Sequence, residues 1–157
     1  MRLYLIRHAP AEPRDGSDDA ARPLTRKGRK QWKRAARGLE RLDVRFDALL
    51  HSPMRRAVET ADEIAHLCDG RIAVSTRLAE PPSIELFPEI AGEQVALVGH
   101  EPWLSELAAI LVLGAAAQGS RFDLKKGSVL RLDGELRPGG MRISSLATMK
   151  TLAALDR

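Results

Sequence analysis

The sequence predicts an α/β fold, a three-layer sandwich in which a mostly parallel central sheet carries helices on both faces. Short apolar runs typical of buried strands alternate with segments of helical period as far as about Leu113, and this alternation favours parallel strands. The last part of the chain differs, because Ser128 to Leu132 and Met141 to Leu146 resemble two strands joined by a Gly/Pro turn. No internal repeat or linker divides the chain, so we expect one domain over residues 1–157.

Local patterns predict the first strand and the first helix. The apolar run from Leu3 to Ile6, which ends at Arg7-His8, is typical of a buried strand. A polar loop punctuated by proline and glycine follows as far as Pro23. Thr25 is suited to be the N-cap of a helix that runs to about Leu42. The apolar stripe of this helix consists of Trp32, Ala35, Ala36, Leu39 and Leu42.

A strand, a helix and a further strand are predicted next. The run from Phe46 to Leu50 is typical of a strand. Ser52 as an N-cap and Pro53 in the first turn predict a helix that Gly70 ends. Arg71 to Val74 is the candidate for the third strand.

The middle of the chain holds the most distinct strand pattern. Arg77 to Glu89 contains three prolines, which predicts a loop with at most a short helical turn. Val95 to Val98 is a strongly apolar, β-branched run followed directly by Gly99-His100, and it indicates a buried strand. Pro102 then begins a helix that extends to about Leu113.

Composition excludes several classes of protein. Apolar residues make up 44% and charged residues 29% of the chain, which is typical of a soluble globular protein. Cys68 is the single cysteine, so an intrachain disulfide and a Cys-rich zinc site are excluded, and we expect a buried, inert thiol. The first apolar run is too short for a signal peptide, and Leu104 to Ala117 is too short to span a bilayer. We therefore expect no membrane association and a cytoplasmic location.

Basic residues are concentrated between Arg22 and Arg45, where Glu40 and Asp43 are the only acidic residues. Such a helix can attract nucleic acid or another anionic partner. The alternative is a solvated helix face, which is what most charge runs are. No nucleic-acid motif or cluster of stacking aromatics accompanies the charge, so we expect no nucleic-acid partner.

Three pieces of chain that carry polar residues each follow a predicted strand. They are Arg7-His8, the segment from Ser52 to Arg56, and Gly99-His100. Ligands of parallel sheets bind at the carboxyl ends of the strands. The order of elements alone therefore predicts that these three pieces meet in one pocket.

The residue types in this pocket suit phosphate. Neither His8 nor His100 has Cys or His neighbours at metal-ligand spacing, so we expect no metal and no other cofactor. A neutral imidazole nitrogen can attack phosphorus and form a covalent intermediate that water later hydrolyses. Arginine can bind two phosphate oxygens with its planar fork and keeps its charge. One nucleophilic histidine among fixed cations is therefore a candidate phosphoryl-transfer site.

The same residues lie in blocks that resemble one family. Leu5-Ile-Arg-His-Ala9 resembles the opening signature of the histidine phosphatase (phosphoglycerate mutase-like) superfamily, with Ala9 where glycine is common. Ser52-Pro-Met-Arg-Arg-Ala-Val-Glu-Thr-Ala61 is similar to its second block, and Val98-Gly-His-Glu-Pro102 to its third. The stretch Arg22-Pro-Leu-Thr-Arg-Lys-Gly28 and the short chain most resemble the SixA-type phosphohistidine phosphatases. The resemblance implies a phosphoglycerate mutase-like sandwich.

The resemblance also implies roles for the site residues. It makes His8 the nucleophile, with Arg7 and His100 binding the phosphoryl group. Two arginines are adjacent in the second block, and the family pattern assigns the functional one to Arg56. Arg55 is then expected to face solvent or to form a salt bridge.

Two further residues have two interpretations each. Arg22 can bind substrate phosphate or hold its loop in place. Glu80 can act as the proton donor to a leaving group, or it can be a loop carboxylate bonded to nearby arginines.

The substrate also stays open at this stage. The resemblance and the short chain favour an open site for phosphohistidine in a protein. The alternatives are a small-molecule phosphate monoester, or a phosphate-binding module without turnover.

Overall fold

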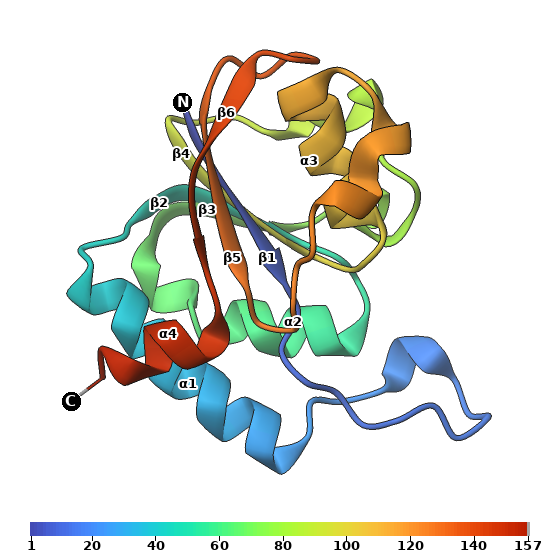
Figure 1. The fold of residues 1–157 in the computed structure, drawn as a ribbon. Coiled ribbons are helices and arrows are strands. Elements are labelled where there is room, and N and C mark those ends of the chain that lie inside the picture. The colour runs from blue at the N-terminus through green and yellow to red at the C-terminus, as the bar shows by residue number, and fades with distance from the viewer. Residues whose placement is uncertain (157) are drawn as a thin grey trace.

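The central sheet has six strands in the order β3-β2-β4-β1-β5-β6, as a computed structural model that describes residues 1–156 shows (Figure 1). Strands β3, β2, β4 and β1 are parallel, and β5 and β6 extend the sheet as an antiparallel hairpin. This arrangement confirms the predicted α/β fold with its mostly parallel sheet. The strands are β1 (Arg2–Arg7), β2 (Phe46–His51), β3 (Cys68–Val74), β4 (Gln94–Gly99), β5 (Val129–Gly134) and β6 (Met141–Ala147).

Helices cover both faces of the sheet (Figure 1). One face carries α1 (Arg26–Arg41), α2 (Arg55–Asp62) and α4 (Met149–Ala154), together with the 3₁₀ turn η2 (Ala65–Leu67). The other face carries α3 (Trp103–Leu113) and the 3₁₀ segments η3 (Thr76–Ala79), η4 (Ile84–Glu89) and η5 (Ala116–Arg121). A further 3₁₀ turn, η1 (Asp19–Ala21), lies in the long loop between β1 and α1.

The core forms two layers because successive side chains of a strand point to opposite faces. In β1, Tyr4 and Ile6 pack against the layer of α1 and α2, whereas Leu3 and Leu5 pack against the layer of α3. Trp32 of α1 is fully buried in the first layer. Burying one large apolar side chain contributes about 1.5–3 kcal/mol, so both layers hold the strands in place.

The first helix begins where the sequence predicts. The hydroxyl of Thr25 accepts a hydrogen bond from the Gly28 amide at 2.8 Å, as an N-cap does. A Cβ atom on Gly28 would lie 2.3 Å from the Pro10 carbonyl oxygen, so only glycine allows α1 to approach this loop so closely. Leu42, which we expected on the apolar stripe, is 55% exposed beyond the end of the helix.

The second helix is shorter than predicted. It begins at Arg55 and ends at Asp62, and its N-cap position is Met54, so the prediction that Ser52 caps it is wrong. The chain has to turn back early because Phe46 of β2 pairs with Cys68 of β3. Cys68 is therefore a partly buried strand residue.

Gly70 lies inside β3, so the prediction that it ends a helix is also wrong. A Cβ atom there would lie 2.0 Å from the carbonyl oxygen of Asp47, beside the irregularity in the pairing of β2 with β3. Glycine is required at this position because the two backbones approach each other so closely.

The carboxyl-terminal part of the chain contains an element that the sequence patterns did not indicate. Helix α4 packs against α1, with Leu152 fully buried between them, and it is capped by Thr148. No helix within residues 1–156 is long and apolar enough to cross a membrane. The cytoplasmic location and the single domain stay predictions.

Candidate active site

The carboxyl ends of three adjacent parallel strands bring the predicted site together. Arg7 at the end of β1 pairs with Gly99 of β4, and the amide of His8 donates to the Gly99 carbonyl at 3.0 Å. On the other side of β4, the amide of Ser52 donates to the Val98 carbonyl at 3.0 Å. The backbone pairing therefore continues one residue past the ends of β1 and β2. It places His8 and Ser52 on either side of the end of β4, which His100 follows.

His8 is buried and has one free ring nitrogen. Its Nδ1 lies 2.7 Å from the carbonyl oxygen of Ala9, so Nδ1 carries the proton and donates it, and Nε2 keeps its lone pair. Burial is the main reason why the pKa of His8 falls to about 3, although the hydrogen bond to Ala9 opposes this shift. Repulsion by His100 in its protonated form and by the permanent charge of Arg56 lowers the pKa further. At neutral pH the imidazole is therefore neutral and able to act as a nucleophile.

His100 lies next to His8, with 5.2 Å between the ring centroids. Its Nε2 is 2.7 Å from the hydroxyl of Ser52, which itself accepts a hydrogen bond from the amide of Met54 at 3.2 Å. In that arrangement the hydroxyl donates to Nε2 and Nδ1 carries the proton. This Nδ1 is buried and has no hydrogen-bond partner in the described part of the chain. Burial, reinforced by the charge of Arg56, lowers the pKa of His100 to about 4.

The two adjacent arginines of α2 point in different directions, because neighbouring helix residues are about 100° apart. Arg56 points inward, its side chain is 5% exposed, and its Nη1 donates to the carbonyl of Asp19 at 2.8 Å. Arg55 points outward, is 56% exposed, and forms an ion pair with Glu59 at 2.9 Å. The structure thus brings Arg56 to His100 and leaves Arg55 at the surface, as the sequence analysis expected.

Arg7 is fixed by the loop that precedes β5. Its Nη1 donates to the carbonyl of Leu124 at 2.7 Å, and the amide of Gly127 lies 3.1 Å from the carbonyl oxygens of both Arg7 and His8. The Nε atoms of Arg7 and Arg56 are buried without a partner within residues 1–156. Nδ1 of His100 is a third buried donor at this sheet edge without a partner in the described residues.

Asp19 is a site residue that the sequence analysis missed. Its carboxylate forms ion pairs with Arg14 at 3.1 Å, Arg22 at 3.0 Å and Arg56 at 3.2 Å. Burial opposes ionisation, but the charges of Arg56, Arg22 and Arg14 together hold the pKa of Asp19 below its ordinary value. Asp19 is therefore an ionised counter-charge of the arginines, and no local pattern in the sequence indicates this pairing.

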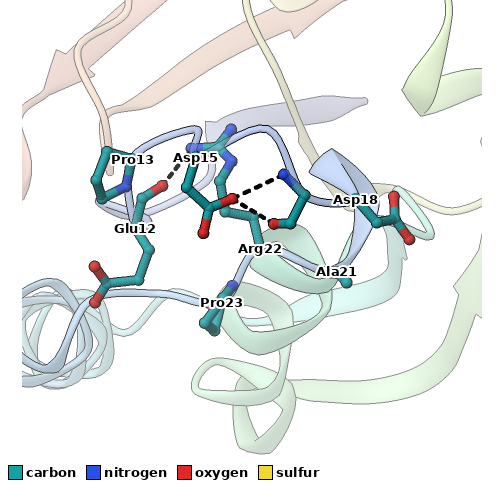
Figure 2. A pocket seen from close by; sticks show the side chains of 8 residues that line it. Glu12, Pro13, Asp15, Asp18, Ala21, Arg22 and Pro23 are labelled. Atoms are coloured by element: carbon teal, nitrogen blue, oxygen red, sulfur yellow. Dashed lines mark hydrogen bonds between the residues drawn. The ribbon is translucent and has the colours of Figure 1, made fainter.

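Arg22 holds the loop between β1 and α1. Its Nη1 donates to the carbonyl of Glu12 at 2.7 Å, and its Nε donates to Asp19. Figure 2 shows the Arg22 guanidinium reaching across this loop behind Asp15, beside a cavity of about 290 Å³. The contacts of Arg22 match the interpretation in which it holds its loop in place. Its positive charge also helps to lower the pKa of His100.

Glu80 has contacts that match the second of its two interpretations. Its carboxylate is 3.8 Å from Arg77 and 54% exposed. Arg77 also pairs with Glu85 at 2.6 Å and with Glu89 at 3.3 Å, so all three carboxylates gather around one guanidinium. The structure thus places Glu80 in a surface ion-pair cluster.

Two hydroxyl groups tie the site together, and the sequence analysis gave neither of them this role. Ser52 orients His100, as described above. The hydroxyl of Thr60 in α2 accepts a hydrogen bond from the amide of Ala9 at 3.0 Å and donates one to the carbonyl of Arg56 at 2.7 Å. The sequence feature that could have indicated the role of Ser52 is its position directly after a predicted strand, at the same sheet edge as both histidines.

No group of three or more His, Cys, Asp or Glu residues within the described range 1–156 is arranged to hold a metal ion. What the site offers is a neutral imidazole beside buried guanidinium groups, at the edge of a parallel sheet. Such an edge binds phosphate and can stabilise the charge of a phosphoryl group in transfer. The fold and the site together define a phosphoryl-transfer protein.

The chain belongs to the histidine phosphatase superfamily (branch 1), whose family model matches residues 3–81. It is 32% identical to an uncharacterized protein of Picosynechococcus in an alignment 154 residues long that covers 92% of this chain and 90% of that protein. It is also 39% identical over 90 residues to the mitochondrial serine/threonine-protein phosphatase PGAM5 of Rattus norvegicus, covering 57% of this chain and 31% of PGAM5.

Solved structures share the fold at low sequence identity. The protein histidine phosphatase SixA complexed with tungstate superposes with a TM-score of 0.78 at 21% identity, covering 97% of this chain and 99% of SixA. The alpha-ribazole phosphatase from Shigella flexneri superposes with a TM-score of 0.74 at 21% identity, covering 95% and 97%. The phosphoglycerate mutase-like fold is thus confirmed, and the family supports phosphatase activity.

Both site histidines should remain neutral in mildly acidic solution. We expect the ring nitrogens of His8 and His100 to show no titration midpoint between pH 8 and pH 5 in ¹⁵N NMR, because their pKa values are about 3 and about 4. The control is the chain unfolded in urea, where histidine titrates at about pH 6.5. Below about pH 6.5 the two histidines are protonated in the unfolded chain but stay neutral in the folded protein. The free energy of unfolding therefore decreases as the pH falls from about 6.5 toward the folded pKa values. A midpoint near 6.5 in the folded protein would contradict the site geometry.

Proposed function

We propose that the protein is a metal-independent phosphatase that works through a phosphohistidine intermediate on His8. The observation that carries the proposal is the hydrogen bond from Nδ1 of His8 to Ala9, which leaves a neutral Nε2 free in a buried cationic site. Nε2 attacks phosphorus, a P–N bond forms, and the bond to the leaving group breaks with its electron pair. Water then attacks the phosphohistidine, inorganic phosphate leaves, and His8 returns to its neutral form.

Arg7, Arg56 and His100 are proposed to bind the phosphoryl oxygens. Each has a buried nitrogen without a partner among residues 1–156, and an unsatisfied buried polar group costs about 1–3 kcal/mol. A phosphoryl group brings acceptor oxygens for all three donors. Because the donors are already in place, they stabilise the charge that develops on the oxygens in the transition state.

Phosphohistidine in a protein is the substrate that we favour. An alkyl ester needs a proton for its leaving alkoxide, whereas an imidazole leaving group can be protonated on its own ring. Asp19 is held ionised by three arginines, and Glu80 is bound to Arg77 at the surface. Neither carboxylate is placed as a proton donor, which favours a substrate that needs none. The fold likeness to SixA, described as a protein histidine phosphatase, agrees with this choice.

One observation favours a small phosphate monoester as a second candidate substrate. Glu101 directly follows His100, and burial raises its pKa, although hydrogen bonds from Ser105 and the charge of Arg7 oppose the shift. A carboxyl group whose pKa is raised, next to His100 in the chain, is a candidate general acid for an alkoxide. The fold likeness to the alpha-ribazole phosphatase agrees with this alternative.

The phosphoenzyme should form on His8. We expect rapid-quench trapping with a ³²P-labelled phosphohistidine protein to give an acid-labile, base-stable label on the wild type and none on His8→Ala. His8 lies at a strand end, so the variant should keep its fold, which circular dichroism checks. Equal labelling of His8→Ala would show that another residue is the nucleophile. Binding of inorganic phosphate without label or turnover would instead indicate a phosphate-binding module.

The two adjacent arginines provide a matched pair of variants. We expect Arg56→Ala to lower kcat/KM by about 10²–10³, because it removes a buried donor from the transition state. Arg55→Ala should change kcat/KM by less than about threefold, since exposed ion pairs contribute little. Steady-state kinetics with p-nitrophenyl phosphate and with a phosphohistidine peptide measures both. The reverse order of effects would mean that Arg55 is the functional arginine.

Glu101 decides between the two substrate classes. For a phosphohistidine phosphatase we expect Glu101→Gln to change turnover of a phosphohistidine peptide by less than about threefold, since the leaving group needs no general acid. If alkyl phosphates are the substrates, the same change should lower turnover of phosphoserine by about 10²–10⁴. Glu106→Gln, a partly buried glutamate in helix α3, which begins two residues after Glu101, is the control. A large loss on phosphoserine alone would favour the ester alternative.

A further inference from the structure

The exposed side of α1 carries cations that no group of the protein neutralises within the described residues. Arg26, Lys27, Lys30 and Lys33 are exposed and have no ion pair or side-chain hydrogen bond in residues 1–156. Positions 26, 30 and 33 are spaced by four and three residues, so they lie on one side of the helix. We call these four residues the α1 stripe.

Other cations of the same helix do have partners. Arg29 pairs with Glu59 at 2.7 Å, and Arg37 pairs with Asp156 at 2.7 Å. The unpaired charges therefore gather in the first half of α1. Acidic residues of the described chain thus form ion pairs with these neighbouring cations, but with none of the four residues of the α1 stripe.

The position of the α1 stripe is unfavourable for the helix itself. The first turn of α1 contains basic residues and no acidic residue, although the amino-terminal end of a helix dipole is positive. Like charges spaced by three or four residues also repel one another. Neither helix stability nor an internal ion pair therefore accounts for the α1 stripe, whereas an anionic surface from outside would complement it.

The α1 stripe starts beside the catalytic edge. The amide of Thr25 donates to the carbonyl of Pro10 at 2.9 Å, two residues after His8, and Gly28 packs against the same carbonyl. Arg29 is tied to Glu59 of α2, the helix that carries Arg56. Figure 1 shows α1 beginning at the loop that follows β1 and running away from it. A partner whose phosphorylated residue enters the site would therefore extend over the first turns of α1.

The chemistry of the α1 stripe favours a protein over nucleic acid or lipid. Trp32 is the only aromatic residue of α1, and it is fully buried with its ring N–H bonded to the carbonyl of Thr60, so it cannot stack on a base. The exposed residues from 26 to 33 are all charged or polar, which leaves no apolar group to enter a bilayer. The α1 stripe is therefore limited to electrostatic contacts, and acidic side chains beside the phosphorylated residue of a protein substrate are the complementary groups that we favour.

Resting on the proposed function, we propose that the α1 stripe binds an acidic surface of the phosphorylated protein substrate and so selects phosphohistidines in acidic surroundings. The α1 stripe then contributes to the binding of the protein substrate and takes no part in the chemistry on His8. Its contribution falls with ionic strength, because the charges are exposed.

The test compares two charge reversals that are matched in net charge. Lys30→Glu/Lys33→Glu alters the α1 stripe, and Arg71→Glu/Arg142→Glu alters exposed arginines on β3 and β6, the two edge strands of the sheet. The probes are two synthetic phosphohistidine peptides, one with aspartates and glutamates on both sides and one with serines and glycines, together with p-nitrophenyl phosphate. We expect the wild type to prefer the acidic peptide by about tenfold in kcat/KM at low salt and to lose this preference at high salt.

The α1 stripe variant should lose the preference for the acidic peptide and keep turnover of the other two probes within about twofold, whereas the edge-strand variant should behave like the wild type. An unchanged preference in the α1 stripe variant would overturn the proposal, and so would an equal loss on all three probes.

Fluorescence anisotropy measures binding of the unphosphorylated acidic peptide, and this measurement does not depend on turnover. Wild-type binding that the α1 stripe variant loses supports the proposal even where no probe is hydrolysed, in which case only the proposed function has failed. Salt-sensitive binding of a single-stranded DNA 20-mer, with no binding of the acidic peptide, would assign the α1 stripe to nucleic acid instead.

Discussion

The site depends on the parallel pairing of β4 with β1 on one side and with β2 on the other. His8, Ser52 and His100 each follow one of these strands, and the amides of His8 and Ser52 continue the pairing onto Gly99 and Val98. A shift of the register by one residue would turn every side chain of a strand to the opposite face and disrupt both core layers. The packing that stabilises the sheet therefore also holds the two imidazole rings 5.2 Å apart.

Burial at this edge sets the charge states of the site. Two histidines in a desolvated, positively charged environment stay neutral, while Arg56, which cannot lose its charge, needs a counter-charge nearby. Asp19 supplies it by binding the terminal nitrogens of Arg56, and the buried Nε of Arg56 has no partner within the described chain. The loop between β1 and α1 thus compensates the buried charge without using the Nε of Arg56.

Much of the fold could be predicted from the sequence because its patterns are local. The order of the six strands along the chain, the cap at Thr25 and the antiparallel ending all follow from periodicity and turn residues within short windows. The predictions for α2 failed where distant contacts decide. Ser52 bonds to His100, 48 residues away, and Gly70 accommodates the close approach of β3 to β2. Helix α4 was not predicted because it depends on packing against α1.

For the site, the sequence by itself determined which residue types stand at the ends of the strands, and the motif around Arg56 separated it from Arg55. The tertiary structure alone decided which nitrogens are free and which are bound. The ion pair between Arg56 and Asp19 joins residues 37 positions apart, and the tautomer of His8 depends on a carbonyl oxygen oriented by the backbone. Periodicity is set by near neighbours in the chain, whereas hydrogen bonds and desolvation depend on groups that only folding brings together.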